Sequence, residues 1–179
     1  MRKQQGFTLL ETLIAFIVLV FGLLGAVALQ ARAKQATYDS MQRAAALGVA
    51  QDIVERIKAN PLGAQAGAYN LTISSNDGVG SGFASCINVD CDPGGLAAYD
   101  AEQWRRAIRG QENTGALADA TVCIEAALAA EQLNIDVTIT WASRQELGSS
   151  ADAGISKQGC GGNTNTRRML AMESYAYVR

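Results

Sequence analysis

The sequence predicts an α+β fold in which a long N-terminal helix packs against a small antiparallel β-sheet that disulfides stabilise. Three observations lead to this expectation. No charged residue occurs from position 12 to position 31, an apolar stripe repeats at four-residue steps before Asn60, and strand-like alternation recurs in the second half. All four cysteines follow the uncharged stretch.

The uncharged stretch is long enough to cross a membrane as a helix. Its twenty residues rise about 30 Å, which matches the thickness of a hydrocarbon core. Residues 7–31 are therefore the predicted membrane-spanning half of the helix. Glu11 stands at its start, although an acid at the centre of a span costs about 2.5–3.5 kcal/mol on insertion scales. We expect this carboxylate to have a specific partner.

Two ordinary interpretations of this segment leave Glu11 unexplained. A secretory signal would use Arg2 and Lys3 as its positive region and would be cut after small residues such as Ala28 or Ala33. Its apolar run would, however, be longer than the usual ~7–15 residues. A plain membrane anchor would be poorly oriented, because basic residues flank the run on both sides.

Residues 32–60 predict a second, amphipathic half of the same helix. Apolar side chains at four-residue steps form a stripe, and charged side chains occupy much of the remaining surface. Asn60 and Pro61 end the helix, because a residue that precedes proline disfavours the helical region. The stripe consists of Ala45, Val49, Ile53 and Ile57.

Residues 61–179 predict a globular domain. We expect loop-like structure over residues 62–95 with a short strand at 71–73, and then a helix over 96–110 that Gly110 caps. Alternating apolar residues predict three antiparallel strands, which would lie on the amphipathic half of the long helix. The strands cover residues 120–128, 134–143 and 167–179, and a long exposed loop covers 147–165. The inward side chains expected on the second helix are Leu96, Tyr99, Trp104 and Ile108.

Residue types and charge exclude several classes of function. The chain has no histidine, which removes the commonest general base and the commonest metal ligand. Residues 61–179 carry eight basic and thirteen acidic groups, a net charge of −5 that does not suit nucleic acid. We expect the cluster of Arg105, Arg106 and Arg109 to be a solvated face. With no catalytic constellation or phosphate-binding loop in the sequence, neither enzymatic activity nor a cofactor or metal is expected.

The four cysteines predict disulfides if the domain is exported. A zinc site at Cys86 and Cys91 is the alternative, but it would need two further ligands in a chain without histidine. Four cysteines allow three pairings. Proximity favours Cys86 with Cys91, which leaves Cys123 with Cys160.

The opening "GFTLLE" and the uncharged run that follows it resemble the type III signal of type IV pilins and pseudopilins. The resemblance implies a leader peptide of residues 1–6, which a prepilin peptidase removes after Gly6 before it N-methylates Phe7. Glu11, four residues further on, lies on the same helical face as Phe7. In a filament, Glu11 is expected to form a salt bridge with the Phe7 amine of a neighbouring subunit.

Later segments are similar to the PilV family of minor pilins. These segments are "AQDIVERIKANP" and the stretch from Cys86 to Trp104. The resemblance implies a low-abundance subunit near the pilus tip that primes or modifies assembly and supports adhesion and twitching motility. Its partners would be other minor pilins, the major pilin and a tip adhesin. The protein would cross the inner membrane once, with a periplasmic C-terminal domain, before it enters the extracellular pilus.

Three alternatives stay open at this point. A type II secretion pseudopilin carries the same kind of leader. A minor pilin that receives DNA in competence would need a basic stripe, which the acidic domain lacks. A secreted enzyme or binding module with an ordinary signal peptide would lose Glu11 when the signal is cut.

Overall fold

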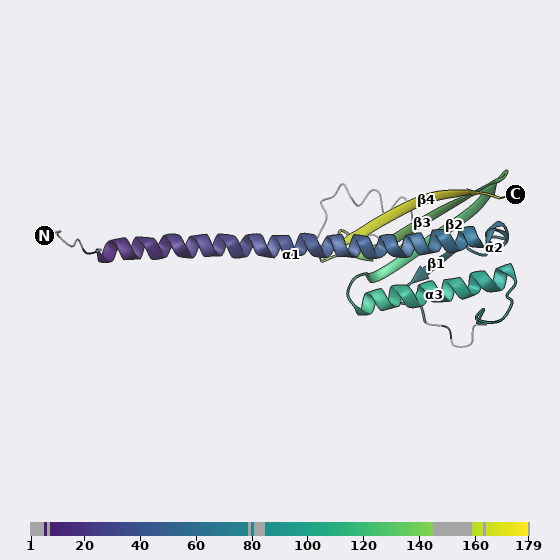
Figure 1. Ribbon diagram of the computed structural model, residues 1–179, viewed down its shortest axis with the longest axis horizontal. Helices are drawn as coiled ribbons and strands as arrows, with labels where there is room; N and C mark the ends of the chain where they lie inside the picture. The colour runs from purple at the N-terminus through teal and green to yellow at the C-terminus, as the bar shows by residue number, and fades with distance from the viewer. Residues whose placement is uncertain are drawn as a thin grey trace. The chain divides into compact units, whose positions relative to one another are not determined.

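The computed structural model describes residues 6, 8–78, 80, 85–144, 159–162 and 164–178. The chain divides into two compact units, Met1–Ser40 and Met41–Arg179, and each is described by itself. The first unit is helical in its described part. The helix α1 (Leu9–Ala59) begins in this unit and continues into the second unit (Figure 1). Phe7 and most of the expected loop at 147–165 lie outside the described residues.

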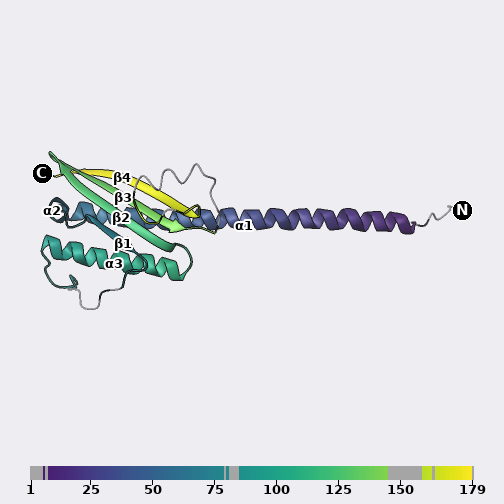
Figure 2. The same ribbon diagram turned by 180° about the vertical axis from the view of Figure 1, so that it is seen from behind.

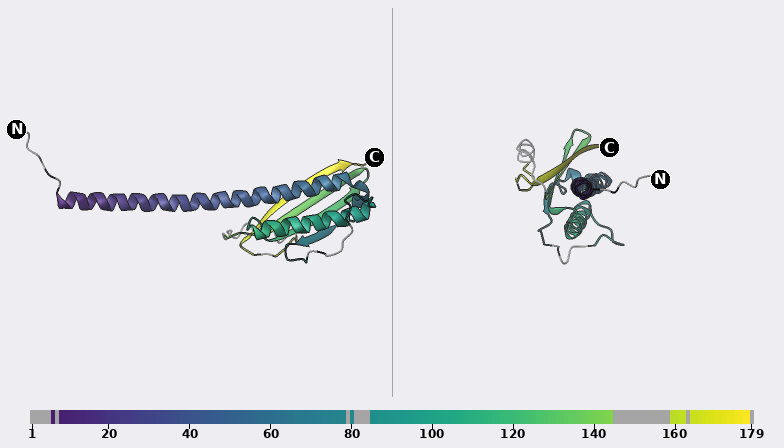
Figure 3. Two further views of the ribbon diagram at one scale, coloured as in Figure 1. Left: turned by 60° about the horizontal axis from the view of Figure 1, so that its bottom comes forward. Right: turned by 90° about the vertical axis from the view of Figure 1, so that its left-hand side faces the viewer.

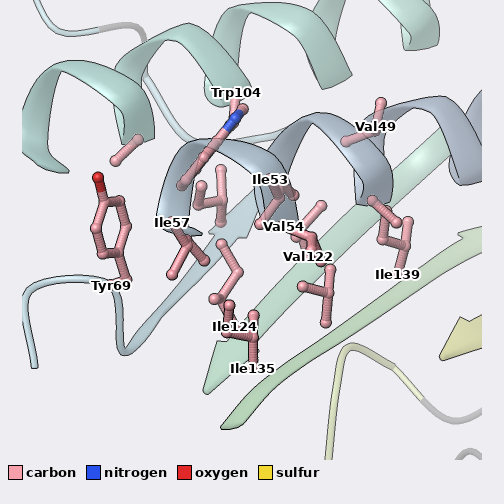
Figure 4. Packing of buried hydrophobic residues seen from close by; sticks show 14 of the residues in the cluster. Val49, Ile53, Val54, Ile57, Tyr69, Trp104, Val122, Ile124, Ile135 and Ile139 are labelled. Carbon is pink, nitrogen blue, oxygen red and sulfur yellow. The ribbon is translucent and has the colours of Figure 1, made fainter. Parts of the chain in front are cut away.

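From Met41 onward, α1 buries one face and exposes the other. The predicted stripe is confirmed, since Ile53 and Ile57 are fully buried and Val49 is 9% exposed. Figure 4 shows strand residues such as Val122 and Ile124 lying against this part of α1. Ala45, the first residue of the stripe, is half-buried, and the residues beside the stripe are also buried, namely Ala46, Ala50 and Val54.

A short helix, α2 (Pro61–Gln65), follows at once, where the sequence suggested only a loop. Asn60 produces both the break and the restart. Its Oδ1 accepts a hydrogen bond from Gly63 N at 3.2 Å, and its Nδ2 donates to the Pro93 carbonyl oxygen at 2.8 Å. A Cβ at Gly63 would lie 2.5 Å from Asn60 Nδ2, so this position requires glycine. The expectation of loop over 62–95 was therefore wrong at its start.

The second long helix, α3, spans Pro93–Asn113 and is longer than predicted. Asp92 caps its start, where Oδ1 accepts from Gly95 N at 2.6 Å, and Pro93 occupies the first turn. Gly110 lies inside the helix rather than capping it, so that prediction was wrong. The chain instead turns out of the helix after Thr114, at Gly115, which has a φ of 74°.

The buried face of α3 differs in part from the expected one. Trp104 and Ile108 are buried as predicted, whereas Leu96 and Tyr99 are only half-buried. Small and acidic side chains take the inward positions in that part of the helix, which brings α3 close to its neighbours. These buried residues are Ala97, Asp100, Ala101 and Glu102.

Four antiparallel strands form one sheet in the order β1-β2-β3-β4, so the predicted strands are confirmed. A turn with Ala130 at a φ of 56° joins β2 to β3. Side chains of β2 and β3 alternate between the core and the outer face, and the core positions are mostly apolar, as period-two patterning requires. The strands are β1 (Leu71–Ser74), β2 (Ala118–Ala129), β3 (Gln132–Ala142) and β4 (Arg167–Tyr177).

Within the second unit, α3 and the last turns of α1 lie side by side on one face of the sheet (Figures 2 and 3). Their side chains and those of β2 and β3 form a single core. Tyr69 and Trp104 pack there with ring centroids 5.9 Å apart. Helices on one face only leave the other face of the sheet outward, which is the α+β arrangement predicted from the sequence.

Candidate functional site

The first turn of α1 presents an exposed carboxylate. Thr8 precedes the helix, and both its Oγ1 and its carbonyl oxygen accept a hydrogen bond from Glu11 N, at 3.3 and 3.1 Å. Thr12 Oγ1 donates to the Leu9 carbonyl oxygen at 2.9 Å. Thr8 and Glu11 thus form the threonine half of a capping box. The signal for it is the T-x-x-E spacing of "TLLE", which the sequence analysis did not use.

The Glu11 carboxylate itself is bound by none of the described residues. A negative charge in the first turn is favoured by the helix dipole, which explains why it is tolerated locally. Gly6 is exposed, and Phe7 lies outside the described residues. The cleavage between Gly6 and Phe7, the methylation of Phe7 and its pairing with Glu11 therefore stay predictions.

From Leu9 to Leu29, α1 presents an apolar surface that no other described residue covers. The large apolar side chains from Leu9 to Leu29 are 47–86% exposed. By length and composition, α1 is the helix in the described residues that could cross a membrane. A Cβ at Gly22 or Gly25 would meet no atom within 4 Å, so the chain's own packing requires neither glycine. An apolar surface of this extent indicates contact with lipid or with other protein chains.

A polar network holds the end of α1 against α3. Arg56 binds Asp52 at 2.9 Å on its own helix and Asp100 at 3.1 Å on α3. Trp104 Nε1 donates to Asp52 Oδ2 at 2.9 Å. Burial by itself lowers the pKa of Arg56, but its bonds to Asp52 and Asp100 outweigh this and raise it. These partners lie 44 to 52 residues apart in the chain, so the network fixes the packing of the two helices.

Tyr69 extends this network into the core. Its hydroxyl donates to Asp100 Oδ2 at 2.8 Å and accepts from Asn60 Nδ2 at 3.0 Å. Burial raises the pKa of Tyr69, and the neighbouring Asp100 carboxylate raises it further. Tyr69 is fully buried and Asp100 is 4% exposed, so both groups serve the fold rather than a substrate.

Two of the three arginines in the cluster on α3 bind a buried carboxylate. The expectation that this cluster is a solvated face was therefore wrong in part. Glu102, with a side chain only 3% exposed, binds Arg105 at 2.7 Å and Arg106 at 3.2 Å. Gly80 N also donates to this carboxylate at 3.3 Å. Burial by itself raises the pKa of Glu102, but hydrogen bonds from Arg105, Gly80 and Arg106 outweigh it and lower the pKa. Arg109 is half-buried.

Two disulfides stabilise the domain. One joins Cys86 to Cys91 ahead of α3, and the other joins Cys123 on β2 to Cys160 in the segment before β4. This is the pairing that proximity in the sequence favours. The first bond closes a ring of six residues, whereas the second closes 38 residues, since the cysteines are separated by 5 and 37 positions.

Arg167 binds the segment at Cys160 to the sheet, a role that no local sequence signal indicated. This buried side chain at the start of β4 pairs with the Asp119 carboxylate and donates to the Asp119 carbonyl oxygen at 2.8 Å. It also donates to Thr140 Oγ1 at 3.4 Å, and Thr140 Oγ1 in turn donates to the Cys160 carbonyl oxygen at 3.2 Å. The contact with Asp119 spans 48 residues, so only the folded chain reveals it.

The outward face of the sheet carries three carboxylates in cross-strand register. Glu125 on β2 lies opposite Asp136 on β3, and Asp136 lies opposite Glu173 on β4. All three are exposed. Like charges that face one another across strands are destabilising. Near them, Tyr175 and Tyr177 are 62% and 72% exposed, with their rings edge to face.

Two models of known protein families match the chain, and together the matches extend over residues 1–102. Residues 1–27 match the model of the prokaryotic N-terminal methylation motif. Residues 28–102 match the family model described as Type IV pilin Tt1218. No curated protein and no solved structure matches the chain.

Proposed function

We propose that this chain, a type IV pilin with an N-terminal methylation motif, is a minor pilin that primes or modifies pilus assembly. It would be incorporated at low abundance near the pilus tip and would support adhesion and twitching motility. Its partners would be other minor pilins, the major pilin and a tip adhesin, after processing by the prepilin peptidase. The family is structural rather than enzymatic, so the function lies in contacts between subunits.

One observation carries the assembly role. Within the matched methylation motif and just beyond it, α1 exposes apolar side chains from Leu9 to Leu29, and the only charge among them is Glu11. A helix of this kind is stable in lipid or among other apolar helices, and it is unsuited to water. The same segment can therefore hold the subunit in the membrane and later enter the core of a filament.

Glu11 would make entry into the filament specific. Cleavage after Gly6 would give Phe7 a cationic amine, and the Glu11 carboxylate has no partner among the described residues. Burying that carboxylate without a partner is costly, whereas pairing it with the amine of a neighbouring Phe7 offsets the cost. Thr8 binds the backbone N–H of Glu11 and not its carboxylate, so the carboxylate is left for an intermolecular contact.

The minor role rests on the PilV-like segments. One of them, residues 50–61, covers the end of α1 with Ile53, Ile57 and the Arg56 network. The other, Cys86 to Trp104, covers the first disulfide and the first turns of α3. We infer four parts with boundaries at 6/7, 31/32 and 60/61: a leader, a membrane and filament-core half of the helix, an amphipathic half, and a periplasmic domain.

The surface of the domain supports a protein partner rather than nucleic acid. Residues 61–179 carry a net charge of −5, and the carboxylate of Glu102 already binds two of the three clustered arginines. Phosphate backbones are bound mainly by free Lys and Arg side chains. We therefore expect only weak binding of duplex DNA at physiological salt.

Replacing Glu11 tests this proposal. Glu11→Ala should leave membrane insertion intact, because it removes a charge from the span, but should reduce the amount of the protein in sheared pili at least fivefold. Glu131→Ala, an exposed acid of the domain, is the matched control and should be incorporated normally. Equal incorporation of both variants would refute the pairing of Glu11 with a terminal amine.

Deletion separates the proposed role from its alternatives. Loss of this subunit should lower the number of surface pili and abolish twitching without depleting the membrane pool of major pilin. Loss of exoprotein secretion with normal pili would instead indicate a pseudopilin, and loss of DNA uptake alone would indicate a competence receptor. Mass spectrometry of the mature protein should find N-methylated Phe7 at its start; a start near Leu29 or Lys34 would indicate an ordinary secretory signal.

A further inference from the structure

The two edge strands of the sheet differ in length. At one edge, β1 is four residues long, whereas β4 at the other edge has eleven residues and contains no proline (Figure 1). The pairing of β4 with β3 runs without a bulge along the whole strand. Proteins usually shorten, bend or charge an exposed edge, because its free backbone groups pair readily with another chain. β4 is neither short nor bent, and Glu173 is the one charged residue from Ala171 to Tyr177.

Every second residue of β4 turns its backbone groups toward this free edge. Val178 N donates to the Glu131 carbonyl oxygen at 2.9 Å, one position beyond the last residue pair of the two strands, so the even-numbered residues bind β3. The odd-numbered residues direct N–H and C=O away from β3, because hydrogen bonding alternates along an antiparallel strand. No described segment pairs with them. They include the exposed residues Ala171, Glu173, Tyr175 and Tyr177.

The charges beside this edge select a basic partner. Glu173 continues the row of carboxylates formed by Glu125 and Asp136, and all three line one hollow of about 330 Å³. A strand added beside β4 would place one side chain directly opposite Glu173, with Cβ atoms about 4.5–5.5 Å apart. A lysine or arginine at that position would offset the repulsion within the row, whereas an acid would add to it.

We propose that β4 accepts an extended segment of a different pilin-like subunit as a fifth strand, with a lysine or arginine of that segment opposite Glu173. Backbone hydrogen bonds to the odd-numbered residues would supply affinity, and the basic side chain would set the register. Tyr175 and Tyr177, which are 62% and 72% exposed, would pack against side chains of the added strand.

A second copy of this chain fits the edge less well than a different subunit. Antiparallel overlap of two β4 strands would bring a second row of carboxylates close to the first, and like charges across strands are destabilising. The inference rests on the proposed function for the class of its partner. A contact with a different subunit also agrees with incorporation at low abundance, because it does not require a row of identical copies.

Photo-crosslinking in cells that assemble pili tests the contact on the full chain. Ala171→benzoylphenylalanine places the probe at an exposed position of β4, close to Glu173. Irradiation should give an adduct with a different pilin-like subunit, and peptide mapping should place the link in an extended segment next to a lysine or arginine. Adding Glu173→Lys should lower the yield at least fivefold, because it sets two basic side chains opposite each other. Adducts only with a second copy, links away from any basic residue, or no adduct at all would overturn the inference.

Glu125→Lys is the matched control, because it makes the same change of charge in the same row. An added strand would lie three strand spacings of about 4.8 Å, or about 14 Å, from β2, beyond the screening length of about 8 Å at physiological salt. The yield should therefore stay close to that of the native sequence. Equal losses for Glu125→Lys and Glu173→Lys would indicate a general effect of charge and would overturn the contact at β4.

A proline substitution tests the backbone part of the contact. Tyr175→Pro removes an N–H that faces the free edge, a position where a strand tolerates proline, and should lower the yield at least fivefold relative to Tyr175→Ala. Tyr175→Ala is the control because it removes the ring and keeps the N–H. Tryptophan fluorescence should show both variants folded, since Trp104 and Trp141 lie in the core. Equal yields from the two folded variants would refute strand addition.

The identity of the partner separates this inference from the proposed function. An adduct through a basic strand of a secretion pseudopilin would support the β4 contact and refute the priming role in the pilus. Loss of surface pili on deletion, without any adduct at β4, would support the priming role and refute the contact.

Discussion

The helix α1 is continuous from Leu9 to Ala59, but the side chains of its first part, Leu9–Leu29, have different surroundings from those of its second part, Met41–Ala59. Ile17 in the first part is 47% exposed, whereas Ile53 in the second is fully buried. The first part is apolar on all sides, and the second confines its apolar residues to one stripe. Helix formation alone therefore does not decide the role of each part. The periodicity of the side chains does, because a stripe matches one packed surface and an all-round apolar surface matches lipid or several partners.

Glu11 and two buried acids of the domain show the same contrast. Asp100 and Glu102 in the domain are buried and bound by arginines of the chain. Glu11 is exposed, and its carboxylate has no partner among the described residues. The fold depends on a carboxylate that is buried and paired within it, because removing one partner leaves the other unpaired, whereas a carboxylate left unpaired at the start of an apolar helix is available to another subunit.

Replacing an isoleucine with aspartate in each part of α1 should give the largest difference in the stability of the domain. Ile53→Asp places an unpaired charge in the core and should destabilise the domain by more than about 4 kcal/mol. Ile17→Asp should leave the domain folded, although it should hinder membrane insertion by about 2.5–3.5 kcal/mol. Tryptophan fluorescence of the full chain in detergent reports on the domain, because Trp104 and Trp141 both lie in its core. Similar unfolding curves for the two variants would break the comparison.

Periodicity made much of this fold predictable. The stripe around Ile53 and the alternation around Ile135 each repeat over two or more turns or residue pairs, so their burial could be inferred without a structure. Single-residue signals were less reliable. Gly110 resembled a helix cap, but the helix continues past it to Asn113. The positive φ that such a cap requires occurs at the next glycine, Gly115.

The polar partners of the domain were not predictable, because they depend on contacts between distant segments. Arg167 finds Asp119 across 48 residues, and Arg56 finds Asp100 across 44. Arg105 and Glu102 are three residues apart, but their pairing matters because the fold buries Glu102, which the sequence did not indicate. The N-terminal segment around Gly6 and Glu11, in contrast, could be interpreted from the sequence. Residues around Gly6 and Glu11 follow a local motif, so their role could be proposed from the sequence.

Removing the disulfides one at a time tests which closure the domain depends on. Replacing Cys123 and Cys160 with serine should cost about 4 kcal/mol, and replacing Cys86 and Cys91 about 2 kcal/mol, because the entropy of the unfolded chain rises more when the longer loop is opened. Urea unfolding of each double variant measures the difference. Equal losses would show that the two loops do not act through chain entropy alone.

Glu102→Gln should destabilise the domain by about 1–3 kcal/mol at neutral pH, because it removes the charge that binds Arg105 and Arg106 in a buried position. The pKa of Glu102 is lowered in the folded state, so its contribution is present at neutral pH and is lost as the pH falls below the ordinary value of 4.5. The variant should therefore lose less stability than the native chain between about pH 5 and pH 2. Glu11→Gln is the control and should leave the unfolding of the domain unchanged at every pH. Parallel acid-side curves for Glu102→Gln and the native chain would contradict this account.

The smallest expected effect has the opposite sign. Asp136 lies between Glu125 and Glu173 on the outward face of the sheet, so its charge faces a like charge on both sides. Asp136→Asn should stabilise the domain by about 0.2–1 kcal/mol, since like charges directly opposite one another are destabilising. The gain should shrink in 1 M salt, where the screening length falls to about 3 Å, and Glu131→Gln at the exposed turn should show no comparable gain. Urea midpoints at low and high salt measure both effects. A stabilising effect would show that the domain keeps a carboxylate its own fold does not require, as the first part of α1 keeps Glu11, whereas a loss of stability would restrict that behaviour to the helix.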